Sequence, residues 1–217
     1  MKFSNVLMFA SFAFAAPAVE VRQQTATGVV VQSAQTVLNT VNTNVAAIRA
    51  ALNGVTGNVD AQVQATVRAN LNAIIAALQT STNTIVVATT GGAGGIIGAA
   101  TGLTQQQVTD LARAVQNTLD AIAQLNVIVT AEATDLTTPL RTFAQSEINA
   151  IRAALNPFVA PVVNFSRAVQ AFSARVGVTV TGLTNVTNSL TSYITTLLRS
   201  LGLGFILPSI PGLFGKH

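Results

Sequence analysis

The stretch VVQSAQTVLNTVNTNVAAIRAAL, residues 30–52, decides the fold of this chain. Apolar side chains recur in it every three or four positions, which is the spacing of one face of an α-helix. Asn53-Gly54 ends the pattern. We therefore predict an amphipathic helix that buries this stripe against other helices. The stripe consists of Val30, Ala34, Val37, Val41, Val45, Ile48 and Leu52.

The same spacing returns five more times and predicts five further helices. Six amphipathic helices with short links make an all-α protein, because each buries its apolar stripe against its neighbours. Residues 29–201 are numerous enough to form one substantial core, so we predict a single helical bundle. The further helices are expected over residues 59–85, 104–129, 139–155, 158–176 and 183–201.

Several residues predict where these helices begin and end. Thr104, followed three residues later by Gln107, has the pattern of a capping box. Pro139 suits the first position of a helix. Asn156-Pro157 predicts a stop or a sharp turn, because proline disfavours helical conformation in the residue before it. The stretch Gly91–Gly98 lacks the glycine pattern of a phosphate-binding loop, and we predict a flexible connector.

The first eighteen residues have the features of a secretory signal peptide. Lys2 supplies a positive charge, residues 6–15 are almost wholly apolar, and small residues follow at Ala16-Pro17-Ala18. We therefore predict a cleaved signal peptide over residues 1–18 and a short polar lead over 19–28. The mature protein is expected outside the cell or in the cell wall.

The composition argues against most enzymes. The chain has no cysteine, and its one histidine is the last residue, His217. Neither a thiol nucleophile, a histidine relay nor a zinc site follows from these residues. Glu132 and Asp135 are close in sequence, but a solvated helix end is their ordinary role. We predict a non-enzymatic protein without a cofactor or a metal.

The positive charge does not predict nucleic-acid binding. The net charge is +4, but only 8% of the residues are charged, so the balance reflects few acids rather than many bases. Phosphate binding needs several converging cations, whereas the arginines of this chain stand singly. Those within the predicted bundle are Arg49, Arg68, Arg113, Arg141, Arg152, Arg167, Arg175 and Arg199.

The polar residues suit a secreted protein that carries sugar. They are mostly threonine, asparagine, glutamine and serine, and two sequons for N-glycosylation occur, at Asn164 and Asn185. The threonine-rich stretches 80–90 and 179–196 are candidates for O-linked sugar on composition alone. These residues therefore predict a glycoprotein.

The predicted interior is built from small and medium aliphatic residues. Such a bundle either fills itself or leaves an apolar channel between the helices that suits an acyl chain. The sequence leaves both alternatives open. The candidate lining residues are Val41, Ile48, Val67, Leu71, Ile74, Leu111, Val115, Leu119, Phe158, Phe165 and Phe172.

These features together resemble a known family. The signal peptide, the stripe that ends at Asn53-Gly54, the second stripe with its threonine-rich exit, and the capped helix from Thr104 are similar to the fungal hydrophobic surface-binding protein A and antigenic cell-wall galactomannoprotein family. The resemblance covers about residues 29–155. It implies a secreted or wall-associated helical domain that binds lipids or hydrophobic surfaces without catalysis. Cell-wall polysaccharide is a further partner expected from the resemblance.

The apolar tail, residues 202–217, is interrupted by Pro208 and Pro211 and is a poor membrane span. We expect it to lie at an interface or against the bundle. The whole chain is thus expected to bind lipids, fatty acyl chains or hydrophobic surfaces. The alternative is a structural cell-wall mannoprotein whose bundle is a scaffold for sugars.

Overall fold

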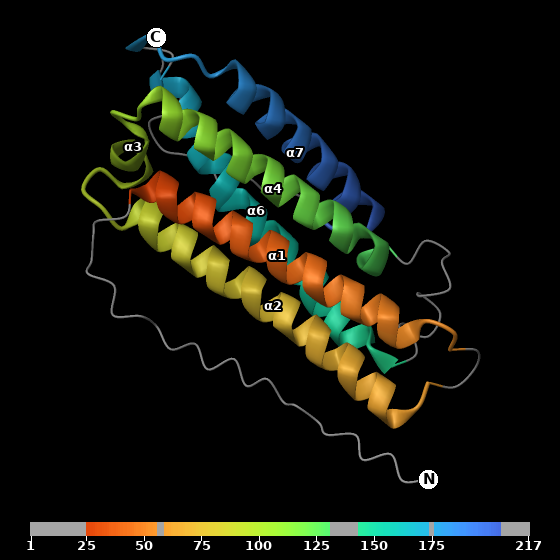
Figure 1. Ribbon diagram of the computed structural model, residues 1–217. Helices are drawn as coiled ribbons and strands as arrows, with labels where there is room; N and C mark the ends of the chain where they lie inside the picture. Colours follow the sequence, from red (N-terminus) through yellow and green to blue (C-terminus); the bar gives the residue numbers. More distant parts are fainter. Residues whose placement is uncertain (1–24, 56–58, 131–142, 174–175, 205–217) are drawn as a thin grey trace, which may run out of the picture.

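The computed structural model describes residues 25–55, 59–130, 143–173 and 176–204 (Figure 1). Within these ranges the chain forms six α-helices, which confirms the predicted all-α bundle. The helices are α1 (Ala26–Leu52), α2 (Ala61–Thr90), α3 (Gly95–Ala100), α4 (Gln105–Val129), α6 (Gln145–Ser173) and α7 (Thr181–Ser200). The predicted signal peptide, the helix start at Pro139, the pair Glu132 and Asp135, and the tail beyond Gly204 lie outside the described residues.

Four long helices form a ring in the order α1, α2, α6, α4, and α7 packs on α4 and α6 (Figure 1). Successive long helices run in opposite directions, so α1 and α4 are parallel neighbours. A hydrogen bond from Asn117 Nδ2 to Gln35 Oε1, 2.9 Å long, joins these two helices. Because α4 lies beside α1, the chain crosses the end of the ring diagonally between α2 and α4, and α3 is part of this crossing.

The crossing corrects one prediction, because the glycine-rich stretch is only partly a connector. Its second half begins the short helix α3, which packs on α2 and α6. Gly94 has a φ of 80° and forms the N-cap of α3. A Cβ atom on Gly98 would lie 2.2 Å from the carbonyl oxygen of Ala93. These glycines allow a tight backbone turn that side chains would obstruct.

We expect Gly98→Ala to destabilise the protein by about 1–3 kcal/mol, because the new methyl group overlaps backbone that cannot rotate away. Chemical denaturation followed by circular dichroism measures the loss. Gly92→Ala is the matched control, since nothing lies within 4 Å of a Cβ at that position. Equal stability of the two variants would show that the close approach at Gly98 is unimportant.

A second prediction is wrong, because the chain does not turn at Pro157. Helix α6 runs without a break through Pro157 and Pro161. A proline inside a helix costs about 3 kcal/mol or more. However, α6 packs against α2, α4 and α7, and Phe158 and Phe165 are fully buried on it. Burial of each such side chain contributes about 1.5–3 kcal/mol, which together with its neighbours outweighs the cost.

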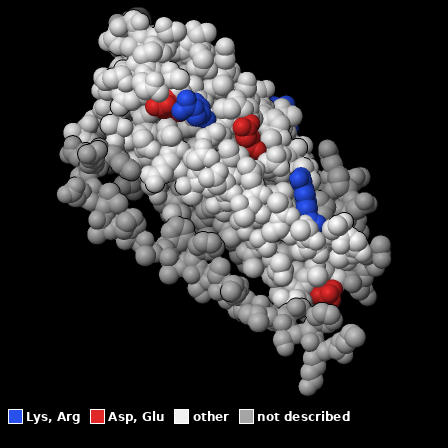
Figure 2. Space-filling model, in the orientation of Figure 1, with Lys and Arg blue, Asp and Glu red and all other residues white. Residues whose placement is uncertain are grey.

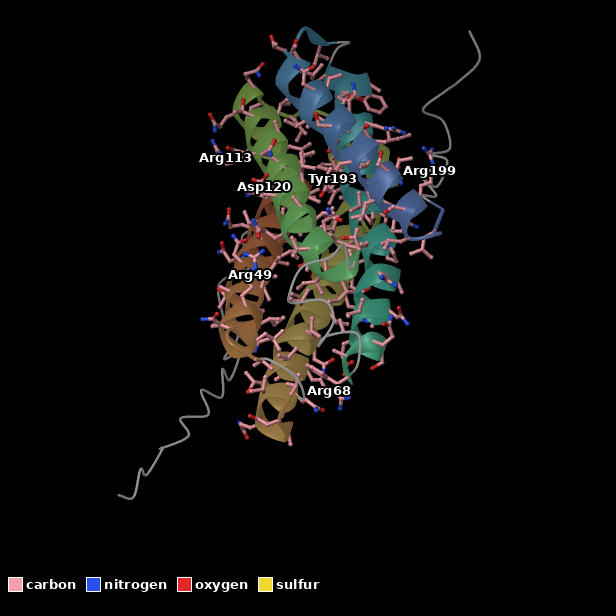
Figure 3. All side chains as sticks on the ribbon, turned by 90° about the vertical axis from the view of Figure 1, so that its right-hand side faces the viewer. Arg49, Arg68, Arg113, Asp120, Tyr193 and Arg199 are labelled. Carbon is pink, nitrogen blue, oxygen red and sulfur yellow. The ribbon has the colours of Figure 1, made fainter. Side chains whose placement is uncertain are left out.

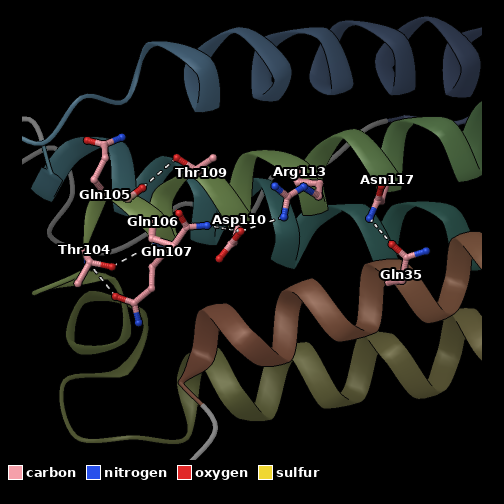
Figure 4. A network of polar contacts seen from close by, with 9 residues as sticks. All are labelled: Gln35, Thr104, Gln105, Gln106, Gln107, Thr109, Asp110, Arg113 and Asn117. Atoms are coloured by element: carbon pink, nitrogen blue, oxygen red, sulfur yellow. Dashed lines mark hydrogen bonds and ion pairs between the residues drawn. The ribbon is translucent and has the colours of Figure 1, made fainter.

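The helix ends follow local chemistry. The predicted capping box is confirmed: Thr104 Oγ1 accepts from the amide of Gln107 at 3.3 Å, and Gln107 Oε1 accepts from the amide of Thr104 at 2.8 Å (Figure 4). At the end of α7, Gly202 has a φ of 71°, and the amide of Leu203 donates to the carbonyl of Leu198 at 2.7 Å. This is a Schellman motif, and it ends the helix where the sequence predicts.

Candidate functional site

The predicted lining residues lie mostly in the core of the bundle. Nine of the eleven are at most 1% exposed and belong to one contiguous hydrophobic cluster, while Leu119 and Phe172 are partly buried against it. A ligand between the helices would have to displace contacts that these side chains make with one another. The nine are Val41, Ile48, Val67, Leu71, Ile74, Leu111, Val115, Phe158 and Phe165.

Two hollows at the described surface are relevant to ligand binding. The smaller, of about 160 Å³, lies where α3, the start of α4 and the end of α6 meet, and Phe172, Leu103 and Val176 are among its walls. The larger is an open hollow of about 410 Å³ between α1 and α2. It is lined by Val29, Asn83, Thr84, Val87 and Ala88.

The larger hollow adjoins apolar side chains that α2 cannot bury. Residues 85–88 are four consecutive apolar residues, and successive side chains on a helix are about 100° apart. They therefore point in all directions around the helix. Ile85 is fully buried, whereas Val86 is 39% exposed and Val87 is 70% exposed. We call the exposed surface of Val29, Asn83, Thr84, Val86, Val87 and Ala88 the α2 face.

Helix α2 as a whole is unusually apolar for an outer helix. Among the described residues, α2 is a helix long and apolar enough to cross a membrane, judged by length and composition alone. It buries one stripe of side chains in the bundle, as an amphipathic surface helix does. The large apolar side chains of α2 from Val67 to Ile85 face the core, and its outer side exposes Val86 and Val87 together with small alanines.

The α2 face is also free of charge. No Asp, Glu, Lys or Arg occurs between Arg68 and Asp110. In Figure 2 charged side chains are few and scattered, and the described surface over most of α2 is white. The polar groups present are amides and hydroxyls, whose transfer out of water costs much less than that of an ion. This surface can therefore contact an apolar phase without burying a charge.

The four arginines labelled in Figure 3 do not form a basic patch. In Figure 3, Arg49, Arg68, Arg113 and Arg199 lie apart and point outward from different helices. Arg113 Nη1 binds Asp110 Oδ1 on the same helix at 2.9 Å (Figure 4). Arg68 has a structural role, since its Nε donates to the carbonyl of Phe143 at 3.1 Å. It also lies 3.6 Å from Glu147 Oε1.

Two arginines hold helix ends on either side of residues 131–142. Arg152 Nε donates to the carbonyl of Val129, the last residue of α4, at 2.9 Å. Arg68 donates to the carbonyl of Phe143, just before α6. The pKa of Glu147 is held below its ordinary value, chiefly because the hydroxyl of Ser146 donates to its carboxylate. These charges stabilise the bundle.

Among the described residues, no cluster of three or more His, Cys, Asp or Glu could hold a metal.

Tyr193 is the one tyrosine of the chain, and it lies on α7. Burial raises the pKa of its phenol above the ordinary value of 10.0, and a hydrogen bond with the side chain of Asn126 on α4 opposes this effect. An acid whose folded pKa is raised loses its proton first in the unfolded chain. The contribution of Tyr193 to the stability of the fold is therefore complete below pH 10 and is lost as the pH rises through the folded pKa.

This assignment predicts the result of a spectroscopic titration. The chain has no tryptophan, so phenolate absorbance near 295 nm reports Tyr193 alone. We expect a midpoint above 10 in the folded protein and a midpoint near 10 in concentrated urea. Coincident midpoints would contradict the burial of this phenol at the contact between α4 and α7.

The two sequons differ in their accessibility. Asn185 is exposed on α7, whereas Asn164 is half-buried on α6. The sequence pattern alone does not distinguish them, because both match the pattern for N-glycosylation.

Comparison with known proteins leaves the family open. No family model, curated protein or solved structure matches this chain. The resemblance of residues 29–155 to the hydrophobic surface-binding family remains a prediction. The α2 face was not among the predicted site residues. The four consecutive apolar residues 85–88 and the uncharged run 69–109 were the signals in the sequence that could have indicated it.

Proposed function

We propose that the protein is a secreted or cell-wall-associated, non-enzymatic binder of lipids, fatty acyl chains or hydrophobic surfaces, and that the α2 face makes the contact. The observation that carries this proposal is the exposure of Val86 and Val87 on an uncharged stretch of α2. The family resemblance supports the same function. It supports secretion as well, together with the predicted signal peptide.

The expected strength of attachment follows from the area of the α2 face. Full burial of an exposed valine contributes about 1.5 kcal/mol, so covering Val86 and Val87, which are already partly covered, contributes at most about 3 kcal/mol. A free energy of this size corresponds to weak, reversible attachment of one molecule. The packed core favours contact at the surface over uptake between the helices, because the bundle need not open.

Adsorption to surfaces of controlled chemistry tests the proposal. The mature protein is passed over methyl-terminated and hydroxyl-terminated layers on a quartz microbalance, and uptake of a labelled fatty acid is measured in solution. We expect saturable adsorption to the methyl layer and little to the hydroxyl layer. Absence of both methyl-selective adsorption and fatty-acid binding would overturn the proposed function.

A structural cell-wall mannoprotein is the second candidate function, and the exposure of Asn185 favours it. In that case the bundle is a scaffold, and the sugar makes the contacts with the wall. Extraction of native walls before and after deglycosylation separates the candidates. A scaffold is released by removal of sugar, whereas a binder of apolar surfaces is released by detergent.

A further inference from the structure

The sequon at Asn185 lies on the side of the molecule away from the α2 face. Helix α7 packs on α4 and α6, whereas the hollow of the α2 face lies between α1 and α2. In Figure 1 α2 and α7 lie on opposite sides of the bundle, and in Figure 3 α1 and α7 are at opposite edges. A group attached at Asn185 would therefore project away from a surface that the α2 face contacts.

Asn185 has the surroundings that a large substituent needs. It is exposed on α7, and its neighbours Asn188 and Ser189, one turn further along, are exposed too. Leu183 and Thr187 hold the opposite side of this turn in the bundle, at 1% exposure each. The fold therefore accommodates a bulky group on Asn185 without moving a core residue.

The third residue of the sequon determines when such a group can be added. Thr187 Oγ1 donates to the carbonyl of Leu183 at 2.7 Å and accepts from Gln170 Nε2 at 3.1 Å. In the folded bundle this hydroxyl is therefore enclosed and engaged. A transferase that recognises the asparagine together with this hydroxyl must act before α7 packs on α6.

Asn164 is a poorer position for the same modification. It is half-buried on α6, between Val163 and Phe165, which are both fully buried. Ser166, the third residue of its sequon, is fully buried and donates to the carbonyl of Val162 at 2.8 Å, so sugar would have to be added before folding here too. A bundle that closes with sugar on Asn164 would have to accommodate it beside fully buried side chains, whereas Asn185 is exposed.

We propose that Asn185 carries an N-linked oligosaccharide, attached before the bundle closes, and that the adsorbed protein presents this sugar outward. The proposal rests on the secretion included in the proposed function. It gives the molecule one apolar face and one sugar-bearing face. A hydrophobic surface coated by the protein then becomes hydrophilic.

Expression of the full chain in a eukaryotic secretory host tests the site. We expect endoglycosidase to increase the electrophoretic mobility of the secreted protein by one step. Asn185→Gln should abolish this shift, and Asn164→Gln should retain it. The unglycosylated protein, folded and then offered to microsomal transferase, is expected to remain unmodified. Loss of the step in Asn164→Gln alone, or an unmodified secreted wild type, would overturn the assignment.

An engineered sugar tests the orientation and keeps it separate from the proposed function. Val86→Asn with Ala88→Thr creates a sequon on the α2 face. We expect enzymatic removal of the native sugar to change adsorption less than twofold, and a sugar at position 86 to reduce adsorption at least about tenfold. A strong effect of the native sugar would overturn the outward orientation. No effect at position 86 would instead contradict the α2 face as the contact, and the Asn185 assignment would stand.

Discussion

Val87→Asp is expected to reduce adsorption to a methyl-terminated surface at least about tenfold without unfolding the protein. Val87 is 70% exposed, so its replacement leaves the core untouched and should change stability by no more than about 0.5 kcal/mol. At the contact, however, the variant loses the burial of a valine, worth about 1.5 kcal/mol, and places a carboxylate against an apolar phase. A loss of about 1.4 kcal/mol is already tenfold in affinity.

Val176→Asp is a closely matched control for this substitution. Val176 is 71% exposed, nearly the same as Val87, but it lies at the smaller hollow near the end of α6. The two variants have the same composition and the same net charge. We expect Val176→Asp to adsorb like the wild type on the microbalance. Equal weakening of both would mean that adsorption depends on overall charge and not on the α2 face.

Phe158→Ala is expected to destabilise the fold by about 3–5 kcal/mol, because it removes a large, fully buried side chain from the centre of α6. Urea unfolding followed by circular dichroism measures the loss. Phe172→Ala, at a partly buried position beside the smaller hollow, should lose less. The comparison tests whether the interior is packed or holds a ligand.

The opposite result would support an internal acyl site. If Phe158 lined an open channel, its removal would cost little stability, since the residue would have few partners, and would change which acyl length binds. Fatty-acid binding measured beside the unfolding curves separates these outcomes. A variant that unfolds more easily but adsorbs normally below its transition would agree with a packed core and an external contact.

Most of the fold could be predicted from the spacing of apolar residues. The stripe from Val30 to Leu52 is buried in α1 as predicted. The capping box of Thr104 and Gln107 begins α4. Both signals are local: a helix shows its buried side by period, and its start by a side chain that caps free amides.

The errors came from interactions between distant segments. Pro157 is a helix breaker by its own chemistry, but α6 is enclosed by α2, α4 and α7, and no local pattern shows that enclosure. Likewise, Gly98 reads as part of a flexible stretch, whereas in the structure it allows a close backbone contact with Ala93. Tertiary packing and steric contact override local preference at these positions.

The candidate site was harder to predict than the fold. The sequence shows that Ile85 and Val87 are both apolar, but not that the first is buried and the second exposed. Only the packing of α2 against α1 and α6 decides which side of the helix is covered. For the same reason, the predicted lining residues were chosen from stripes that the folded bundle uses for its core.

Carbene footprinting of the adsorbed protein tests the central claim most directly. Free protein and protein adsorbed to methyl-terminated beads are labelled and cleaved with trypsin. The peptide 69–113 reports most of α2, and the peptide 176–199 reports α7. We expect adsorption to reduce labelling of 69–113 at Val86 and Val87 and to leave 176–199 unchanged. Reduced labelling of α7 alone, or increased labelling of the core residues Leu111 and Phe158, would contradict attachment of a closed bundle through the α2 face.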